Sequence, residues 1–265
     1  MSKPTIIILG AEGFIGRAIR ERLAASHQLV CVDKAPLSRR GEHELPLQLD
    51  MGKAGDIETL FSSVDASSVA GVIDLVAYYD FKNAPDERYT EIEEGLDLIL
   101  QRCRDVLPPD APFIYASSMA ALEPTEPGRK LGPDAPRSGA WAYTAHKVRC
   151  EEIIEAADIP QPRVELVLAG VYSQWCELVP LYQQIERVRR ASVERHFYPG
   201  PTDRGFPYLH VDDAAAAFEA AIVGCRGREG VHRYMVSEDE PVTYRAVQDV
   251  AARTIHGAGG GIRRV

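Results

Sequence analysis

The sequence predicts a doubly wound α/β fold on a parallel sheet, from two observations. Short apolar runs rich in Val and Ile recur without polar alternation, which indicates strands covered on both faces; they lie at 5–9, 28–32, 71–77, 112–117 and 163–168. Segments with helical spacing of apolar residues separate them, at 14–25, 56–64, 88–106 and 142–157. This order is typical of a parallel sheet with helices on both faces.

The regular alternation ends near residue 169. A helical stretch, a Pro- and Gly-rich loop at 197–207, an alanine-rich helix at 212–222 and a strand at 232–237 follow. We therefore predict a sheet domain over residues 1–168. A smaller substrate-binding portion over residues 169–265 is expected to interweave with the sheet edge.

Charge and cysteine content exclude several classes of protein. The 265 residues carry 39 acidic and 30 basic side chains, with a net charge of −9 and no long basic run, so neither nucleic acid nor an anionic membrane is an expected partner. Five scattered cysteines without a CxxC pair predict no disulfide framework and no metal site. We expect a cytoplasmic protein, and no apolar run is long enough to span a bilayer.

A glycine-rich turn follows the first predicted strand. Gly10, Gly13 and Gly16 open the first helix, where glycines let backbone amides approach a pyrophosphate. Asp33 ends the second strand, 33 − 10 = 23 residues after the first glycine. A carboxylate there accepts hydrogen bonds from ribose hydroxyls and repels a 2′-phosphate, which favours NAD over NADP. The alternatives are a turn role for Asp33, and capture of a phosphate by nearby Lys34, Arg39 or Arg40.

A tyrosine and a lysine lie four positions apart in the predicted helix at 142–157. Tyr143 and Lys147 therefore share one helix face. Lowering the pKa of a tyrosine from about 10 to near 7 requires about 4 kcal/mol, and an ammonium about 4 Å away supplies an interaction of that size. Ser118 lies at the end of the strand before this helix, where a hydroxyl can hold a substrate oxygen while Tyr143 moves the proton. Each residue alone also has an ordinary structural explanation, as a cap, a packed ring or a solvated charge.

These features resemble the extended branch of the short-chain dehydrogenase/reductases, often called NAD-dependent epimerase/dehydratases. The resemblance runs from about residue 4 to about 256 and implies that residues 1–168 form an NAD(P)-binding Rossmann domain. It implies that Tyr143 is the acid/base, that Lys147 lowers its pKa and holds the nicotinamide ribose, and that Ser118 positions the reacting oxygen. It also suggests a homodimer formed by the helices at 88–106 and 142–157. The cofactor contacts implied are Gly10, Gly13, Phe14, Ile15, Gly16, Asp33, Asp50, Met51, Val76, Ala77, Tyr143 and Lys147.

The chain departs from the family pattern at several positions. Met119 and Ala120 occupy the places of the Asp-Glu pair of sugar-nucleotide 4,6-dehydratases, which argues against that reaction. Gly170 and Phe206 align with an asparagine and an arginine that many nucleotide-sugar enzymes carry. Aromatic residues gather in segments expected to border the substrate pocket, although buried packing is an equally good explanation for each; together with Ser118 the candidates are Tyr78, Tyr79, Phe81, Trp175, Phe206 and Tyr208.

The sequence therefore predicts an NAD-dependent oxidoreductase that moves hydride between nicotinamide and a carbinol or carbonyl carbon of a small molecule. An epimerase that recycles bound NAD is the nearest alternative, because the same three residues support it. A non-catalytic NAD-sensing regulatory module is the alternative from another class, and the intact Ser118, Tyr143 and Lys147 argue against it. Substrate identity, reaction direction and stereochemistry depend on pocket shape, which the sequence does not specify.

Overall fold

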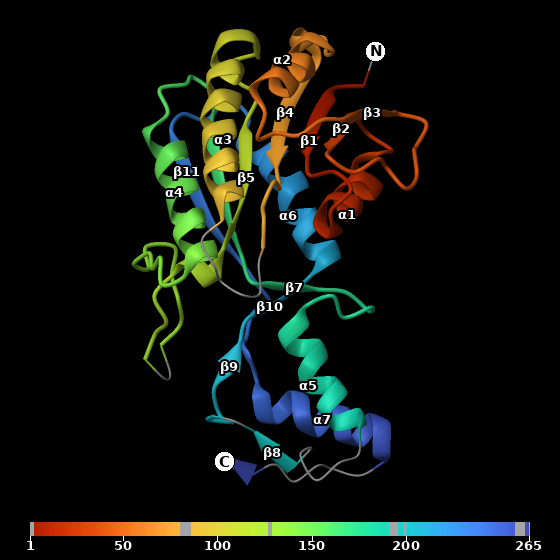
Figure 1. Cartoon of the computed structure of the whole chain (residues 1–265), viewed down its shortest axis with the longest axis vertical. Helices are drawn as coiled ribbons and strands as arrows, with labels where there is room; N and C mark the ends of the chain where they lie inside the picture. The colour runs from red at the N-terminus through yellow and green to blue at the C-terminus, as the bar shows by residue number, and fades with distance from the viewer. Residues whose placement is uncertain are drawn as a thin grey trace. The chain divides into compact units, whose positions relative to one another are not determined.

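A computed structural model gives the structure of the chain (Figure 1). It describes residues 3–79, 86–126, 129–190, 196–198, 200–257 and 263–264. The chain forms two compact units. The first contains Met1–Pro124, Lys130–Leu168 and Asp212–Val236, and the second contains Thr125–Arg129, Ala169–Val211 and Ser237–Val265. The chain leaves the first unit after Leu168 and returns to it for Asp212–Val236.

The first unit is built on a parallel seven-stranded sheet of order β11-β6-β5-β4-β1-β2-β3. Its strands are β1 (Thr5–Leu9), β2 (Gln28–Asp33), β3 (Glu44–Gln48), β4 (Val69–Asp74), β5 (Phe113–Ser118), β6 (Arg163–Leu168) and β11 (Val231–Val236). The strand order reverses between β1 and β4, and in such sheets ligands bind outside the carboxyl ends of the strands at that point. The predicted doubly wound fold class is confirmed.

Helices cover both faces of this sheet. Figure 1 shows α2 (Ala54–Ser62), α3 (Glu87–Val106) and α4 (Ala142–Ala156) on one face. Their apolar sides form a buried core with alternate strand residues such as Ile7 and Leu9, as the two-residue period of a strand requires. Helices α1 (Phe14–Leu23) and α6 (Val211–Gly224) are joined by an ion pair of 2.6 Å between Arg22 and Glu219. Short 3₁₀ turns lie at Ala66–Ser68 (η1) and Met119–Ala121 (η2).

Strand β3 was not expected from the sequence. Its residues Glu44–Gln48 include Pro46, which argues against a strand inside a sheet. The strand pairs with β2 alone and ends the sheet order. Proline is tolerated on such an edge because one side of the strand needs no hydrogen-bond donors.

The second unit is smaller and mixed. Helices α5 (Val179–Arg189) and α7 (Tyr244–His256) pack around Val188, Ala251 and Ala252. Three two-stranded sheets accompany them: β7 (Gly170–Tyr172) with β10 (Tyr208–His210), β9 (Gly205–Phe206) with β12 (Val242–Thr243), and β8 (Phe197–Tyr198) with β13 (Arg263–Arg264). No helix in the described part of the chain is long and apolar enough to cross a membrane.

Candidate active site

The glycine-rich turn joins β1 to α1 with almost no free space. Gly10 has a positive φ of 82°, a conformation that favours glycine. A Cβ on Gly16 would lie 2.3 Å from the carbonyl oxygen of Gly10, so only glycine allows this approach. Helix α1 begins after Gly13, which provides no side-chain cap, and no acidic residue lies in its first turn. Its first backbone N–H groups therefore suit an anion such as a pyrophosphate.

Asp33 lies at the carboxyl end of β2, beside this turn. One carboxylate oxygen accepts a hydrogen bond of 2.9 Å from the backbone N–H of Glu12, and the other accepts one of 3.0 Å from Ala35. The carboxylate is only partly buried and retains lone pairs for further donors. Asp33 thus stabilises the turn and can also accept hydrogen bonds from ribose hydroxyls.

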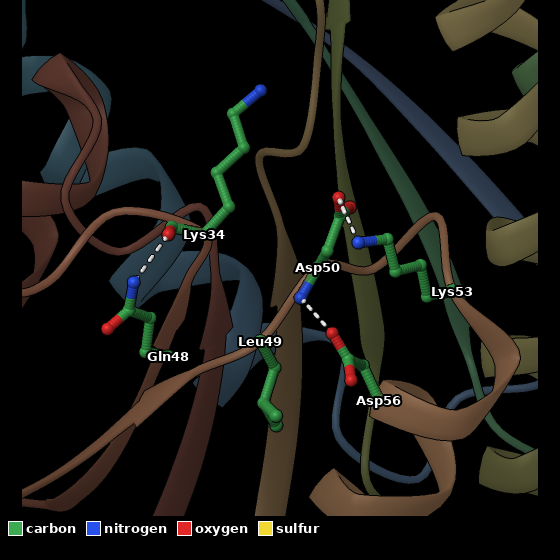
Figure 2. Close-up of a pocket in the computed structure, with 6 residues that line it drawn as sticks. All are labelled: Lys34, Gln48, Leu49, Asp50, Lys53 and Asp56. Atoms are coloured by element: carbon green, nitrogen blue, oxygen red, sulfur yellow. Dashed lines mark hydrogen bonds and ion pairs between the residues drawn. The ribbon is translucent and has the colours of Figure 1, made fainter.

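A shallow pocket of about 290 Å³ lies where β2 and β3 end (Figure 2). Asp50 lines it and Met51, next in the chain, is buried. The backbone N–H of Asp50 donates to Asp56 at 2.8 Å, and the Gln48 side chain donates to the carbonyl oxygen of Lys34 at 3.2 Å. The remaining lining residues are Leu49 and Lys53. This pocket is lined by side chains of both charges and includes Asp50, one of the cofactor contacts that the family resemblance implies.

Lys147 is buried in the first unit, with 3% of its surface exposed. Its ammonium donates to the carbonyl oxygen of Ala116 at 2.8 Å and to the hydroxyl of Tyr115 at 3.0 Å. The ammonium nitrogen lies 6.0 Å from the centre of the Tyr143 ring. The lysine therefore lies beside Tyr143, and hydrogen bonds to β5, the strand that carries Ser118, hold its ammonium in place.

Tyr143 and Ser118 are both partly exposed. The Tyr143 ring packs edge-on against the Tyr79 ring, with 4.9 Å between centroids. The Ser118 hydroxyl accepts a hydrogen bond of 3.2 Å from the backbone N–H of Ala120 and caps η2. Its own O–H remains a donor for another acceptor, so the cap does not exclude a role toward a substrate oxygen.

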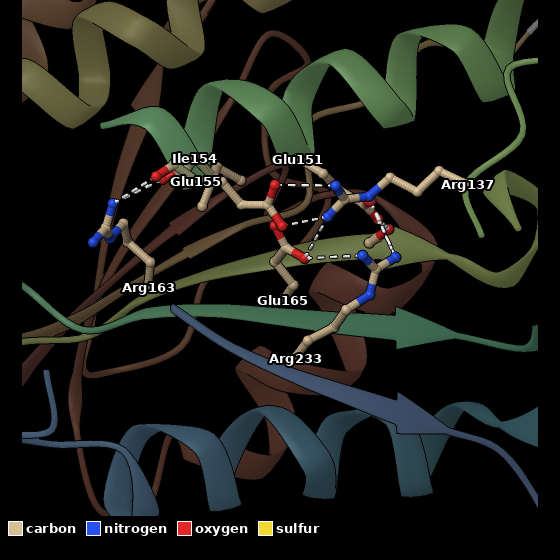
Figure 3. A network of polar contacts seen from close by, with 8 residues as sticks. Arg137, Glu151, Ile154, Glu155, Arg163, Glu165 and Arg233 are labelled. Atoms are coloured by element: carbon tan, nitrogen blue, oxygen red, sulfur yellow. Dashed lines mark hydrogen bonds and ion pairs between the residues drawn. The ribbon is translucent and has the colours of Figure 1, made fainter. Parts of the chain in front are cut away.

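A buried polar network ties β5 to α4 behind these residues (Figure 3). Ser117, next to Ser118, donates to Glu151, which follows Tyr143 by two helical turns. Glu151 also accepts from Arg137 and from Arg233 of β11, the latter at 3.1 Å. Because Glu151 is fully buried and paired, the network fixes the strand end relative to the helix.

Asp74 is a buried acid near this site that the sequence analysis did not single out. It ends β4 opposite Tyr115 of β5, and 3% of its surface is exposed. Burial raises its pKa to about 6, although the N–H of Val76 and the charge of Lys147 act in the opposite direction. An acid in the apolar run at 71–77 was the only signal available in the sequence. An unpaired buried carboxylate is costly, so its proximity to Lys147 explains its presence.

The segment after β4 contains five predicted contacts. Val76 and Ala77 follow the strand directly, and the neighbouring Leu75 lies 3.2 Å from where a Cβ of Gly10 would be. Arg88 stacks on the Tyr78 ring at 3.6 Å and donates to its hydroxyl at 2.7 Å, so Tyr78 has a structural role. Tyr79 is half exposed beside Tyr143. Phe81 lies outside the described residues.

The other aromatic candidates belong to the second unit. Trp175 is 78% exposed, whereas Tyr208 is buried. The rings of Phe206 and Tyr208 lie 5.4 Å apart, and Tyr172 packs edge-on against Tyr208 and donates to Glu238 at 2.8 Å. Within this unit, Phe206 and Tyr208 form a packed aromatic group and Trp175 does not join it. Across the described residues of both units, no cluster of three His, Cys, Asp or Glu side chains could hold a metal ion.

Comparisons with known proteins agree with this geometry. The sequence matches the model of the NAD dependent epimerase/dehydratase family over residues 6–236. Among curated proteins, no sequence matches the chain. The fold is similar to that of the Bordetella bronchiseptica enzyme WbmG in complex with NAD and UDP, with a TM-score of 0.76 and 19% identity over 100% of this chain and 81% of that one.

Two further solved structures share the fold. The UDP-glucose 4-epimerase of Thermus thermophilus in complex with NAD has a TM-score of 0.75 and 21% identity over 98% of this chain and 85% of that one. The dTDP-glucose 4,6-dehydratase of Bacillus anthracis in complex with NAD has a TM-score of 0.75 and 15% identity over 99% and 84%. These likenesses confirm the expected fold, and the family match confirms the expected class of NAD-dependent enzyme. The chain belongs to the NAD-dependent epimerase/dehydratase family.

Proposed function

We propose that the chain is an NAD-dependent oxidoreductase of the extended short-chain type, in which Tyr143, Lys147 and Ser118 act on a carbinol or carbonyl group. The observation that carries this proposal is the position of Lys147, which is buried, held by Tyr115 and Ala116, and lies beside the partly exposed Tyr143. A buried ammonium is costly. Its retention next to a partly exposed tyrosine favours a chemical role.

Tyr143 is proposed to move the proton. When bound, NAD supplies a hydride acceptor at its nicotinamide ring. The Tyr143 phenolate takes the proton of the substrate hydroxyl as the carbinol carbon is oxidised, and in reverse the phenol returns it to the carbonyl oxygen. Lys147 stabilises the phenolate by its positive charge. The Ser118 O–H donates to the substrate oxygen and orients it.

The residues proposed to hold NAD follow from the same geometry. The N–H groups at the start of α1, including those of Phe14, Ile15 and Gly16, face the pyrophosphate. Asp33 accepts hydrogen bonds from the hydroxyls of the adenosine ribose. Asp50 and Met51 border the adenine at the pocket in Figure 2. Val76 and Ala77 follow Leu75, whose backbone lies beside Gly10 of the glycine turn.

The substrate class is proposed from the walls of the site. Met119 and Ala120 lie in η2 where a dehydratase needs an acid and a base, which argues against dehydration. Tyr79 presents a half-exposed ring beside Tyr143 and offers a stacking surface. A ring-shaped or partly apolar alcohol or ketone fits this wall.

Epimerisation of a nucleotide sugar is the second candidate. Its support is that similar solved structures include UDP-glucose and UDP-N-acetylglucosamine 4-epimerases. The same three residues would oxidise the sugar and then reduce it from the other face, without release of the cofactor.

We also propose a homodimer formed by α3 and α4. These helices pack side by side on one face of the sheet, and α3 carries the exposed apolar residues Leu98 and Val106. A cytoplasmic location is supported by five cysteines of which none forms a disulfide and four are buried.

Spectroscopic assay of the purified protein tests the proposal. Panels of secondary alcohols, ketones and UDP-sugars are incubated with NAD or NADH, and NADH absorbance and sugar products are recorded. NADH formation or consumption that Tyr143→Phe abolishes supports an oxidoreductase, and interconversion of two sugars without net NADH supports an epimerase. Turnover that persists in Tyr143→Phe would contradict the mechanism.

A further inference from the structure

Asp74 is an acidic residue at the end of a strand that is otherwise apolar. Strand β4 is buried along its whole length, and the acid follows Val72 and Ile73. Asp74 itself is 3% exposed, and its Oδ1 accepts a hydrogen bond of 2.9 Å from the backbone N–H of Val76. A buried carboxylate costs far more free energy than an apolar side chain. Such costly groups are typical of functional sites.

The register of the sheet sets Asp74 between β1 and β5. It pairs with Leu9 of β1 and with Tyr115 of β5. Paired residues of neighbouring strands lie about 4.8 Å apart and point to the same face, which Figure 1 shows covered by α3 and α4. The hydroxyl of Tyr115 accepts a hydrogen bond of 3.0 Å from the ammonium of Lys147. Asp74 is therefore the strand neighbour of the tyrosine that binds this ammonium.

Three other titratable groups around Asp74 carry no charge at neutral pH. Cys103 of α3, Cys150 of α4 and Tyr115 are each at most 1% exposed. Burial raises the pKa of Cys150 to about 12, and it also raises the pKa of Cys103 and of Tyr115 above their ordinary values. Among the described residues, the charge that acts on Asp74 is that of Lys147. The buried space between these strands and helices thus holds one cation and one acid.

Two further titratable groups lie between α3 and α4. Glu93 accepts hydrogen bonds of 2.8 Å from His146 and from Arg149, so the guanidinium of Arg149 compensates its charge. Burial lowers the pKa of His146, which is therefore neutral at pH values above about 7. Neither Glu93 nor His146 adds an uncompensated charge near Lys147.

Tyr143 experiences the charges of both Lys147 and Asp74. Its ring centre lies 6.0 Å from the Lys147 ammonium, which favours the phenolate, whereas a carboxylate in the neighbourhood disfavours it. Both charges act through the protein interior, where Coulomb interactions are stronger than in water. Burial raises the pKa of Asp74 to about 6, so this carboxyl is already ionised in the alkaline range in which a tyrosine titrates. The net effect on Tyr143 is the difference between two opposing charges.

From this arrangement we infer that Asp74 is a positioning residue for the proposed reaction: its carboxylate is the internal counter-charge of Lys147 and limits how strongly that lysine favours the phenolate of Tyr143. The inference rests on the proposed function of Tyr143 and Lys147. A phenol that ionises too readily is a poor acid when a carbonyl is reduced, and one that resists ionisation is a poor base when an alcohol is oxidised. The two opposing charges keep Tyr143 able to act in both directions.

Titration of Tyr143 in the protein without substrate tests this inference. Tyrosines are labelled with carbon-13 at Cζ for NMR, and the Tyr143 signal is identified by its loss in Tyr143→Phe. The pH midpoint of its ionisation is measured in the wild type, Asp74→Asn, Asp74→Ser and Asp74→Glu. Asn and Ser both keep an oxygen that can accept from the N–H of Val76, so Asp74→Ser serves if Asp74→Asn does not fold. Asp97→Asn, an exposed neutralisation on α3, is the matched control.

We expect the neutral variants to lower the midpoint by about one pH unit, a roughly tenfold change in the ionisation constant. Asp74→Glu and Asp97→Asn should leave it within about 0.3 pH units. A purely structural role predicts the opposite sign, because a loosened Lys147 would raise the midpoint toward that of a free tyrosine. An unchanged or raised midpoint in a folded neutral variant would overturn the inference. A wild-type midpoint near the ordinary tyrosine value of about 10 would instead contradict the proposed function.

Discussion

The Phe206 ring lies so close to Gly170 that a Cβ on residue 170 would meet its Cε1 atom at 2.4 Å. In the family resemblance, these two positions are aligned with an asparagine and an arginine that many nucleotide-sugar enzymes carry. The Phe206 ring and the Leu178 side chain fill the space that a side chain at 170 would need. An asparagine at 170 would therefore require both of these side chains to move or be replaced.

The first prediction concerns this contact. Gly170→Ala is expected to lower the free energy of unfolding by about 1 to 3 kcal/mol, since it overpacks a filled space. Phe206→Leu should rescue part of that loss in the double variant. Urea unfolding of the two single variants and the double variant measures the coupling. Gly55→Ala in α2, where a Cβ meets no atom within 4 Å, serves as a control and should be neutral or stabilising. Strictly additive single effects would contradict the proposed contact.

Tyr143→Phe should reduce turnover by roughly 10²- to 10⁴-fold, the usual contribution of a general acid or base. The affinity for NAD should change less than about twofold, because the ring and its contact with Tyr79 remain. Steady-state kinetics and NAD titration separate the two effects. Tyr182→Phe on α5, at an exposed tyrosine, is the matched control and should behave as wild type.

Tyr115→Phe tests the support of Lys147. The change removes the hydroxyl that accepts from the lysine at 3.0 Å and leaves a buried ammonium with one fewer partner. We expect a loss of about 1 to 3 kcal/mol in the free energy of unfolding. Denaturant unfolding provides the measurement. An unchanged midpoint with an unchanged slope would show that the hydrogen bond from Lys147 to Tyr115 does not contribute to stability.

Glu165 makes stability depend on pH. Burial raises its pKa to about 8, and the neighbouring Glu151 acts in the same direction. Its folded-state pKa exceeds its unfolded one, so the stabilisation is complete below about pH 4 and is lost as pH rises through about 8. Glu165→Gln should therefore be more stable than the wild type at pH 9, by roughly 5 kcal/mol, and similar at pH 4. Urea midpoints across this range, with exposed Glu123→Gln as control, test the sign. A wild type that gains stability between pH 4 and 9 relative to Glu165→Gln would refute it.

Much of the first unit could be predicted because its signals are local. The turn and the strand beside it are predicted by Gly10, Gly13, Gly16 and Asp33, and the buried strands are predicted by the apolar runs. Strand β3 escaped prediction because its pairing with β2 is a tertiary contact that overrides the proline within it. The roles of Asp74 and Tyr115 near Lys147 could not be predicted, because this proximity arises from the register of β4 with β5 and from the packing of α4.

The second unit was harder to predict for the same reason. Its strands are two or three residues long, too short for a periodic pattern. The link between Gly170 and Phe206 joins residues 36 positions apart (206 − 170 = 36), and nothing in either local sequence indicates it. The proposed cofactor residues come from local sequence signals, whereas the walls that would select a substrate depend on such distant contacts.

The most direct test of the central claim is the nucleotide content of the freshly purified protein. After denaturation, NAD, NADH, NADP and NADPH are quantified per chain, and protein stripped of nucleotide is titrated with NAD. The account predicts NAD or NADH, either retained near one per chain, as an epimerase requires, or rebound reversibly, as a dehydrogenase requires. Protein that carries no NAD or NADH and fails to bind added NAD would contradict it.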